Sequence, residues 1–300
     1  MRPTHLVLSI AVAAALAACG GEPAPAVDTP AAAASTHEFS PELDKGDFAE
    51  MVKTLSSDEF EGRAPGAPGG EMTVEYIKAQ YERIGLEPGG DDGSFFQTVP
   101  MVETTADEST VLRLDVAGKQ SELKFGPDMV IGTRTGEAEV RVADSELVFV
   151  GYGVDAPELG WNDYEGIDVT GKTVVILVND PGFHANDETL FEGNRMTYYG
   201  RWTYKFEEAA RKGAAAALII HDTAGASYGW DVVKNSWSGP QFDLRASDDP
   251  EPRLPAQGWL SAEAAKQLFA DAGQDLDALY TAANQRGFKA VPLDARVSFE

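Results

Sequence analysis

The sequence predicts a mixed α/β fold, and three observations lead to this prediction. Residues 173–178 and 214–220 are continuous apolar runs, which are typical of strands buried on both faces of a sheet. Residues 201–212, just ahead of the second run, have the pattern of a helix that ends at Gly213. Beyond residue 104, several shorter segments alternate apolar and polar residues, as strands with one solvent-facing side do.

Two amphipathic helices are predicted ahead of these strands. The first begins near Ser40, which is followed by a proline suited to the first helical position. The second runs from about residue 71 to residue 84 and ends at Gly85. Residues 56–70 are rich in glycine and proline and are predicted to be non-helical. The apolar stripes of the two helices are Phe48, Val52 and Leu55 in the first and Val74, Ile77, Tyr81 and Ile84 in the second.

The same patterns predict the remaining elements. Strands are expected in residues 95–102, 111–125 (a hairpin), 139–143, 146–153, 254–260 and 288–300, and helices in residues 262–273 and from there to about residue 284. Because the last strand reaches the final residue with no turn after it, we expect this chain to be the N-terminal portion of a longer protein.

The first residues are predicted to be a targeting segment. Residues 1–18 contain an apolar stretch that is too short to span a bilayer as a mature helix. The sequence LAAC, which ends at Cys19, resembles a bacterial lipobox with a lipidated cysteine; an ordinary secretory signal cleaved nearby is the alternative. Residues 19–39, rich in alanine and proline, are typical of a flexible tether. We therefore expect a protein of the cell envelope, either an outer-membrane lipoprotein facing the periplasm or a secreted protein.

The composition limits the partners. The 300 residues carry 24 Lys and Arg against 49 Asp and Glu, a net charge of −25. Such a surface repels nucleic acid and anionic lipid, so no nucleic-acid partner is expected and a membrane is expected only through the lipid anchor. Cys19 is the only cysteine, which excludes an internal disulfide and a cysteine-based zinc site.

Two short motifs suggest enzymes but lack the context that those enzymes need. Residues 225–229, GASYG, match the nucleophile elbow around Ser227, yet no histidine follows and no helix is predicted from Trp230 onward. Residues 151–156, GYGVDA, loosely match a dinucleotide-binding motif, but no helix is predicted after them. A loop and a turn are the preferred interpretations.

A complete metal site within the chain is not expected either. His184 and His221 are the only histidines beyond residue 40, and the sequence contains no H-E-x-x-H motif. His221 is instead expected to satisfy polar groups at the end of its strand.

Several blocks together resemble the bacterial two-zinc aminopeptidases. EFEGRAPGAPGG and YIKAQYERIGLEPGGDDGSFFQTVP resemble the N-terminal helices of that family. VFVGYGVDAPELGWNDYEGIDVTGKTVVILVNDPGF and TYYGRWTYKFEEAARKGAAAALIIHD resemble the protease-associated (PA) domain inserted in it, which also occurs in glutamate carboxypeptidase and transferrin receptor. The resemblance extends over nearly all of residues 40–300.

The resemblance implies a domain plan and an activity. Residues 40–103 would be the N-terminal helical part of an incomplete α/β zinc-peptidase domain, and residues 104–300 a PA domain, a β-sheet or barrel with flanking helices. The family's H-x-D-H motif, its other zinc ligands and its glutamate base have no counterpart here, so this chain is expected to hold no catalytic residue and no zinc. The full-length protein would bind two zinc ions and remove N-terminal residues from peptide substrates with its C-terminal peptidase half; this chain alone would be inactive.

The stretch around residue 200 supplies the candidate substrate contacts. Tyr199, Arg201 and Tyr204 are candidates because arginine binds carboxylates through a planar fork and aromatic rings accept peptide side chains. Arg201 also resembles an arginine that contacts substrate in the carboxypeptidase relatives, although the match is not in register. The alternative is a structural aromatic cluster. Arg63 could line the cleft but is expected to bond backbone carbonyls of its loop.

Two other functions stay open. A lipid-anchored PA module that binds peptides or proteins without catalysis fits the same residues. A PA domain attached to a subtilisin-type serine protease is disfavoured, because residues 56–66 resemble the zinc family instead.

Overall fold

The structure is a computed structural model that describes residues 37–42 and 44–300. The chain divides into two compact units between Thr98 and Val99. The signal peptide predicted for residues 1–18, the lipidation site Cys19 and most of the tether lie outside the described residues. The assignment of residues 40–103 and 104–300 to a peptidase domain and a PA domain stays a prediction.

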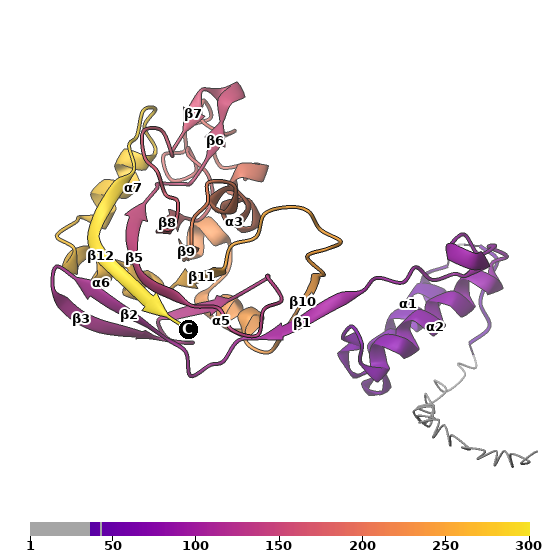
Figure 1. The fold of residues 1–300 in the computed structure, drawn as a ribbon. Helices are drawn as coiled ribbons and strands as arrows, with labels where there is room; N and C mark the ends of the chain where they lie inside the picture. Colours follow the sequence, from indigo (N-terminus) through magenta and orange to yellow (C-terminus); the bar gives the residue numbers. More distant parts are fainter. Residues whose placement is uncertain (1–36, 43) are drawn as a thin grey trace, which may run out of the picture. The chain divides into compact units, whose positions relative to one another are not determined.

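The first unit is helical (Figure 1). It contains α1 (Lys45–Leu55), α2 (Pro68–Arg83) and two short 3-10 turns, Asp58–Arg63 and Asp91–Gly93. Helix α1 begins later than predicted, because its N-terminus is capped by Asp44, whose side chain accepts a hydrogen bond from the Gly46 amide, and not by Ser40.

The start of α2 corrects the prediction that residues 56–70 are non-helical. Pro68, Gly69 and Gly70 form the first turn of this helix. A Cβ on Gly69 would lie 1.9 Å from the carbonyl oxygen of Phe60, and one on Gly70 would lie 2.3 Å from that of Ala64. The glycines therefore allow the preceding loop to pack on the start of the helix, a long-range contact that overrides their poor helix propensity.

The apolar stripe of α2 is exposed. Val74, Ile77 and Ile84 are 42%, 37% and 57% exposed. Phe48 of α1 is 70% exposed as well. Such a row of exposed apolar side chains is typical of a helix that packs against something else.

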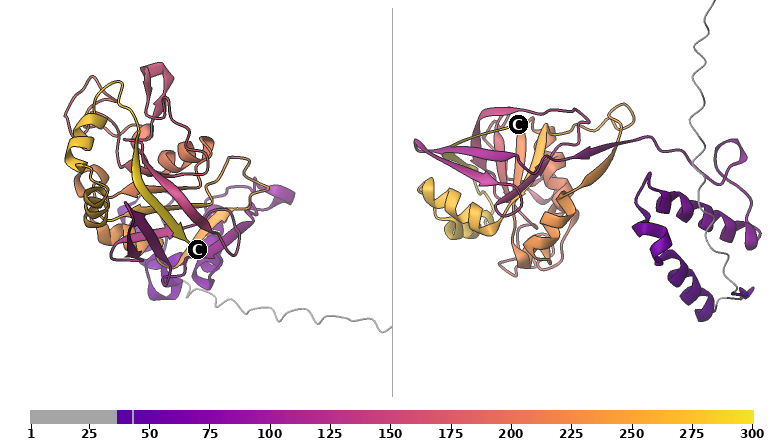
Figure 2. Two further views of the ribbon diagram at one scale, coloured as in Figure 1. Left: turned by 60° about the vertical axis from the view of Figure 1, so that its left-hand side comes forward. Right: turned by 90° about the horizontal axis from the view of Figure 1, so that it is seen from below.

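The second unit is built on an eight-stranded mixed sheet, with strand order β3-β2-β12-β5-β8-β9-β11-β4. The strands of this sheet are β2 (Val111–Val116), β3 (Lys119–Lys124), β4 (Met129–Gly132), β5 (Val142–Phe149), β8 (Thr173–Leu177), β9 (Ala216–Ile220), β11 (Ala256–Leu260) and β12 (Val291–Phe299). Strands β5, β8, β9 and β11 run parallel, and the C-terminal β12 returns antiparallel beside β5 (Figures 1 and 2). The mixed α/β prediction is confirmed.

The remaining elements connect or flank this sheet. Two small ladders pair β1 (Met101–Thr105) with β10 (Pro240–Leu244) and β6 (Asp155–Ala156) with β7 (Trp161–Asn162). The helices are α3 (Trp202–Arg211), α4 (Thr223–Ala226), α5 (Trp230–Trp237), α6 (Ala262–Asp271) and α7 (Leu276–Ala283), with 3-10 turns at Pro157–Leu159 and Tyr198–Gly200.

Helix α6 packs on one face of the sheet. The ring of Phe269 in α6 meets Phe149 of β5 edge-on, with 5.3 Å between centroids. Residues paired across neighbouring strands share a face. The register therefore places four residues on this face: Phe149, Val175, Leu218 and Gly258.

Helices α3 and α5 pack on the opposite face. Gly258 of β11 pairs with Ile131 of β4, so Gly132, the next residue of β4, lies on the face of the sheet opposite to α6. A Cβ on Gly132 would lie 3.7 Å from the Trp237 ring of α5, and this ring packs against Phe206 of α3 at 6.1 Å. The chain therefore leaves β9 toward one face of the sheet and β11 toward the other.

Several local predictions need correction. The two strands predicted at residues 139–143 and 146–153 are one shorter strand, β5, which spans Val142–Phe149. Of residues 95–102, only the last two enter a strand. The turn predicted at residues 151–156 is confirmed, since Gly151 and Gly153 adopt positive φ angles of 56° and 62°. Strands β4 and β10 were not predicted, because β4 has four residues and β10 buries none of its side chains.

The prediction that no helix follows Trp230 is wrong, since α5 spans Trp230–Trp237. Trp230, Val233 and Trp237 supply its apolar side at spacings of three and four residues, and Val233 is buried. The preceding GASYG stretch is also partly helical, because α4 ends at Ala226, and Ser227 follows this helix with φ of 69°. Ser227 thus lies beyond a helix and not directly after a strand, which is not the geometry of a nucleophile elbow.

Candidate functional site

The aromatic segment of residues 197–206 brings the predicted site residues together. Tyr199 is half-buried, and its ring packs edge-on against Phe191 and Tyr204 at 5.7 Å and 5.0 Å. Its hydroxyl donates a hydrogen bond to Glu158, and this bond raises the pKa of Tyr199 to about 12. Tyr204 is buried, and its hydroxyl donates to the carbonyl of Asp155 at 3.2 Å. Tyr204 therefore packs on the buried side of the segment, and Tyr199 lies nearer to solvent.

Arg201 is the most accessible of the three predicted residues. It is exposed and occupies the N-cap position of α3 with extended backbone. Within residues 37–42 and 44–300, its guanidinium group makes no ion pair and no hydrogen bond. Tyr198 and Trp202 beside it are 58% and 41% exposed. A planar cation flanked by exposed aromatic rings can accept a carboxylate together with an apolar side chain.

Arg63, the other arginine considered, has a structural role. Its Nη1 donates to the carbonyl of Leu55, the last residue of α1. This confirms the expectation that Arg63 bonds backbone, although the carbonyl belongs to the helix end and not to the loop itself.

A buried charged cluster lies beneath the aromatic segment. Lys205 is fully buried, and its Nζ donates to the carbonyl of Tyr152 at 2.6 Å. Asp163 and Asp180 are buried as well. Asp163 accepts hydrogen bonds from the Trp161 indole at 2.8 Å and the amide of Val154 at 3.0 Å. Asp180 accepts from the amide and hydroxyl of Thr197 at 2.9 Å and 2.6 Å, so it fixes the point where the aromatic segment begins.

Burial controls the protonation of this cluster. Burial raises the pKa of Asp163 to about 7, raises the pKa of Asp180, and lowers the pKa of Lys205 to about 7. The three residues were not identified from the sequence. The one available signal was a lysine that stands between Tyr204 and Phe206 in the sequence.

Asp163 is expected to make stability depend on pH. Its pKa is about 7 in the folded chain and about 3.9 when unfolded, so between these values the folded chain holds the extra proton. The free energy of unfolding therefore falls as pH rises through this window. Lys205, with a pKa of about 7, stays charged in both states below about pH 6. The Asp163→Asn variant should therefore lose more free energy of unfolding, relative to the unaltered chain, near pH 4.5 than near pH 6. Urea unfolding of both proteins at each pH measures the difference. A difference that stays the same at both pH values would contradict this.

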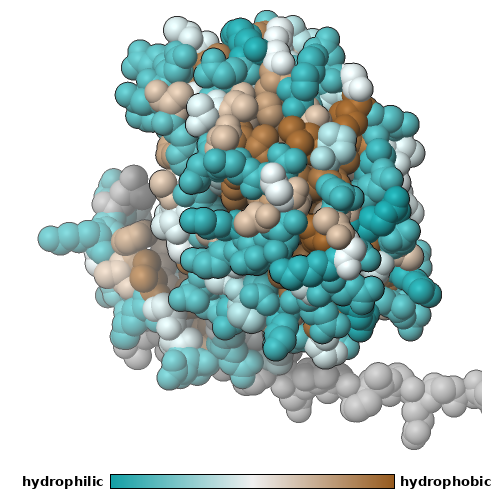
Figure 3. Space-filling model, turned by 90° about the vertical axis from the view of Figure 1, so that its left-hand side faces the viewer, coloured by the Kyte–Doolittle hydropathy of each residue, from teal (hydrophilic) through white to brown (hydrophobic). Residues whose placement is uncertain are grey.

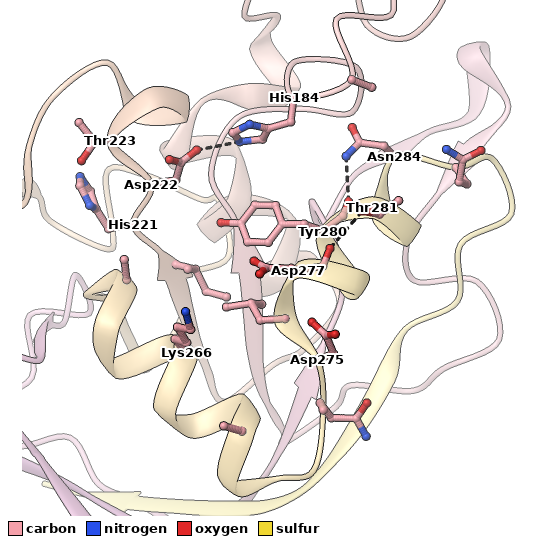
Figure 4. A pocket seen from close by; sticks show the side chains of 17 residues that line it. His184, His221, Asp222, Thr223, Lys266, Asp275, Asp277, Tyr280, Thr281 and Asn284 are labelled. Atoms are coloured by element: carbon pink, nitrogen blue, oxygen red, sulfur yellow. Dashed lines mark hydrogen bonds and ion pairs between the residues drawn. The ribbon is translucent and has the colours of Figure 1, made fainter.

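A cavity of about 930 Å³ opens where β8 and β9 end, and α6 and α7 line its other side (Figure 4). His184 and Asp222 meet on its wall, with 2.7 Å between Nε2 and a carboxylate oxygen. Asp222 also caps α4 by accepting from the amides of Ala224 and Gly225. The bond from His184 is the main cause that lowers the pKa of Asp222. The cavity thus contains a histidine held in a fixed orientation by a carboxylate.

The described residues do not provide a zinc site. His184 directs Nε2 at Asp222, and His221 is buried with its Nε2 on the carbonyl of Tyr228 at 3.0 Å. No group of three or more His, Cys, Asp or Glu side chains is arranged to hold a metal ion within residues 37–42 and 44–300. His221 thus bonds a carbonyl in the turn after α4, and not a polar group at the end of its own strand as predicted. That the chain holds no zinc stays a prediction.

Comparisons with known proteins leave the family open. No protein-family model matches the chain, and no curated protein matches it. Among solved structures, an aminopeptidase from Aneurinibacillus sp. strain AM-1 is similar over 85% of this chain, with 19% identity and a TM-score of 0.33. The match covers 45% of that aminopeptidase chain, so this chain spans less than half of its length. Among the described helices, none is long and apolar enough to cross a membrane.

Proposed function

We propose that this chain is the N-terminal part of a cell-envelope zinc aminopeptidase, with a second unit that helps to bind peptide substrates. The observation that carries the proposal is the joint resemblance of residues 59–100 and 148–222 to that family. The metal ligands and the general base would belong to a peptidase half that follows this chain. That half would supply two zinc ions to polarise the peptide carbonyl.

Two features of the structure support this proposal. The exposed stripe of α2, including Val74 and Ile77, is what a peptidase domain would cover with its own sheet. Arg201 offers a free guanidinium beside exposed aromatic rings. Both features fit a chain that contributes surfaces to a larger enzyme.

Arg201→Ala tests the substrate-binding part of the proposal. In the longest natural gene product, we expect KM for a peptide with a free C-terminal carboxylate to rise about tenfold or more, the loss of one charge-assisted contact. The matched control is Arg195→Ala, another exposed arginine, which forms an ion pair with Glu192. Steady-state kinetics unchanged in Arg201→Ala would exclude this role.

The alternative is a lipid-anchored binding module without catalysis. Arg201 and the cavity at the ends of β8 and β9 would serve such a module equally well, since neither requires a metal. Metal content and peptidase activity of the natural gene product separate the two functions, because only the enzyme requires zinc.

A further inference from the structure

The cavity is lined by the loop that follows β8, the end of β9, α6 and α7, and it lies where the connections of the parallel sheet change direction. The chain leaves β9 toward the face that carries α5 and leaves β11 toward the face that carries α6. In open α/β sheets, ligands bind in the crevice that such a reversal creates beyond the carboxyl ends of the strands. Figure 3 shows the side of the unit with α6 and α7, where hydrophobic residues gather within a hydrophilic rim.

The cavity has one rigid polar wall and an apolar floor. His184 is fixed by Asp222 at 2.7 Å and by the ring of Tyr280, which it meets edge-on with 5.6 Å between centroids. Ile220, at the end of β9, and Leu276, at the start of α7, contribute apolar surface. A volume of about 930 Å³ is in the range of small-molecule sites.

Three polar groups around this floor have no partner. Lys266 of α6 and Asp277 of α7 form no ion pair, and the hydroxyl of Tyr280 forms no hydrogen bond, in the part of the chain that the structure describes. Figure 4 shows Lys266 and Asp277 on neighbouring helices, with the ring of Tyr280 extending across the cavity above them. A cationic and an anionic group therefore border the same apolar space without neutralising each other.

We propose that this cavity binds a small zwitterion, a free α-amino acid or dipeptide with an apolar side chain. The ammonium group would pair with Asp277, the carboxylate with Lys266, and the side chain would lie on Ile220 and Leu276. The hydroxyl of Tyr280, which can donate and accept a hydrogen bond, would add a further polar contact.

The charged groups around the cavity favour a zwitterion over a ligand that carries a single charge. A pure anion would be repelled by Asp277 and by a chain of net charge −25. A pure cation could pair with Asp277 but would leave Lys266 without a counter-charge, and the carboxylate of Asp222 is already bonded to His184 and the start of α4. A ligand with both charges meets a partner for each. The inference goes beyond the proposed function and does not depend on it, because binding is measured in this chain itself.

The test is calorimetric titration of the 300-residue chain with three probes: L-leucine, L-leucinamide (carboxylate blocked) and N-acetyl-L-leucine (ammonium blocked). We expect L-leucine to bind at least tenfold more tightly than either blocked probe, since each lacks one charged contact. Lys266→Met should abolish the preference for leucine over leucinamide but retain the preference for leucine over N-acetyl-leucine. Asp277→Asn should abolish the preference for leucine over N-acetyl-leucine but retain the preference for leucine over leucinamide.

The controls are Lys124→Met and Asp294→Asn, which alter exposed residues outside the cavity. Both should retain the affinity and the preferences of the unaltered chain. Absence of L-leucine binding at millimolar concentration would overturn the proposal. Leucine binding that Lys266→Met and Asp277→Asn leave unchanged would overturn it as well, because the ligand would then occupy another site.

Discussion

Lys205→Met is expected to lower the free energy of unfolding at pH 6 by about 3–5 kcal/mol, the usual effect of removing one member of a buried charged group. Lys205 is buried beside Asp163 and Asp180, and with a pKa of about 7 it is charged at this pH. Methionine fills a similar volume but removes the cation that faces Asp180, and it leaves the carbonyl of Tyr152 without its donor. Urea unfolding followed by circular dichroism measures the change.

The matched control lies on the same chain segment. Lys212 forms an ion pair with Asp155 at 2.6 Å but is partly exposed, so Lys212→Met should cost at most about 1 kcal/mol. Equal losses for Lys205→Met and Lys212→Met would show that the buried cluster does not stabilise the fold.

Gly258→Ala is expected to reduce stability by about 3 kcal/mol, at the upper end of the usual cost of overpacking. Gly258 lies in β11 between β9 and β4, and a Cβ there would be 2.1 Å from the carbonyl oxygen of Val130. Because the obstacle is backbone of the neighbouring strand, no side-chain rotation relieves it. The β4 edge of the sheet must shift instead.

Gly229→Ala is the control for this substitution. A Cβ at Gly229 meets no atom within 4 Å, and its φ of −78° suits any residue. We expect a change below about 0.5 kcal/mol in chemical unfolding. A Gly258→Ala variant as stable as this control would mean that β4 and β11 do not pack as closely as described.

Local sequence patterns predicted the centre of the sheet well. Strands β8 and β9 are five-residue runs with every side chain buried, so their composition identifies them without further information. The α2 stripe was equally predictable, since Val74 and Ile77 follow helical spacing. Helix α5 could not be recognised in the same way, because a helix of eight residues offers only three apolar positions, too few for helical spacing to stand out.

The polar clusters could not be predicted in the same way. Asp163, Asp180 and Lys205 come from three separate segments and meet only because β5 and β8 are neighbours in the sheet and α3 packs on it. His184 and Asp222 likewise meet because the strands before them are adjacent. Among 49 acidic residues, no local pattern distinguishes the few that the fold buries.

The most direct test of the proposed function is the zinc content and aminopeptidase activity of the complete natural gene product, purified from the cell envelope. We expect about two zinc ions per molecule and release of N-terminal residues from peptides. Chelation of the zinc should abolish this activity, and added zinc should restore it. A product that contains no zinc and cleaves no peptide would contradict the account and favour the lipid-anchored binding module.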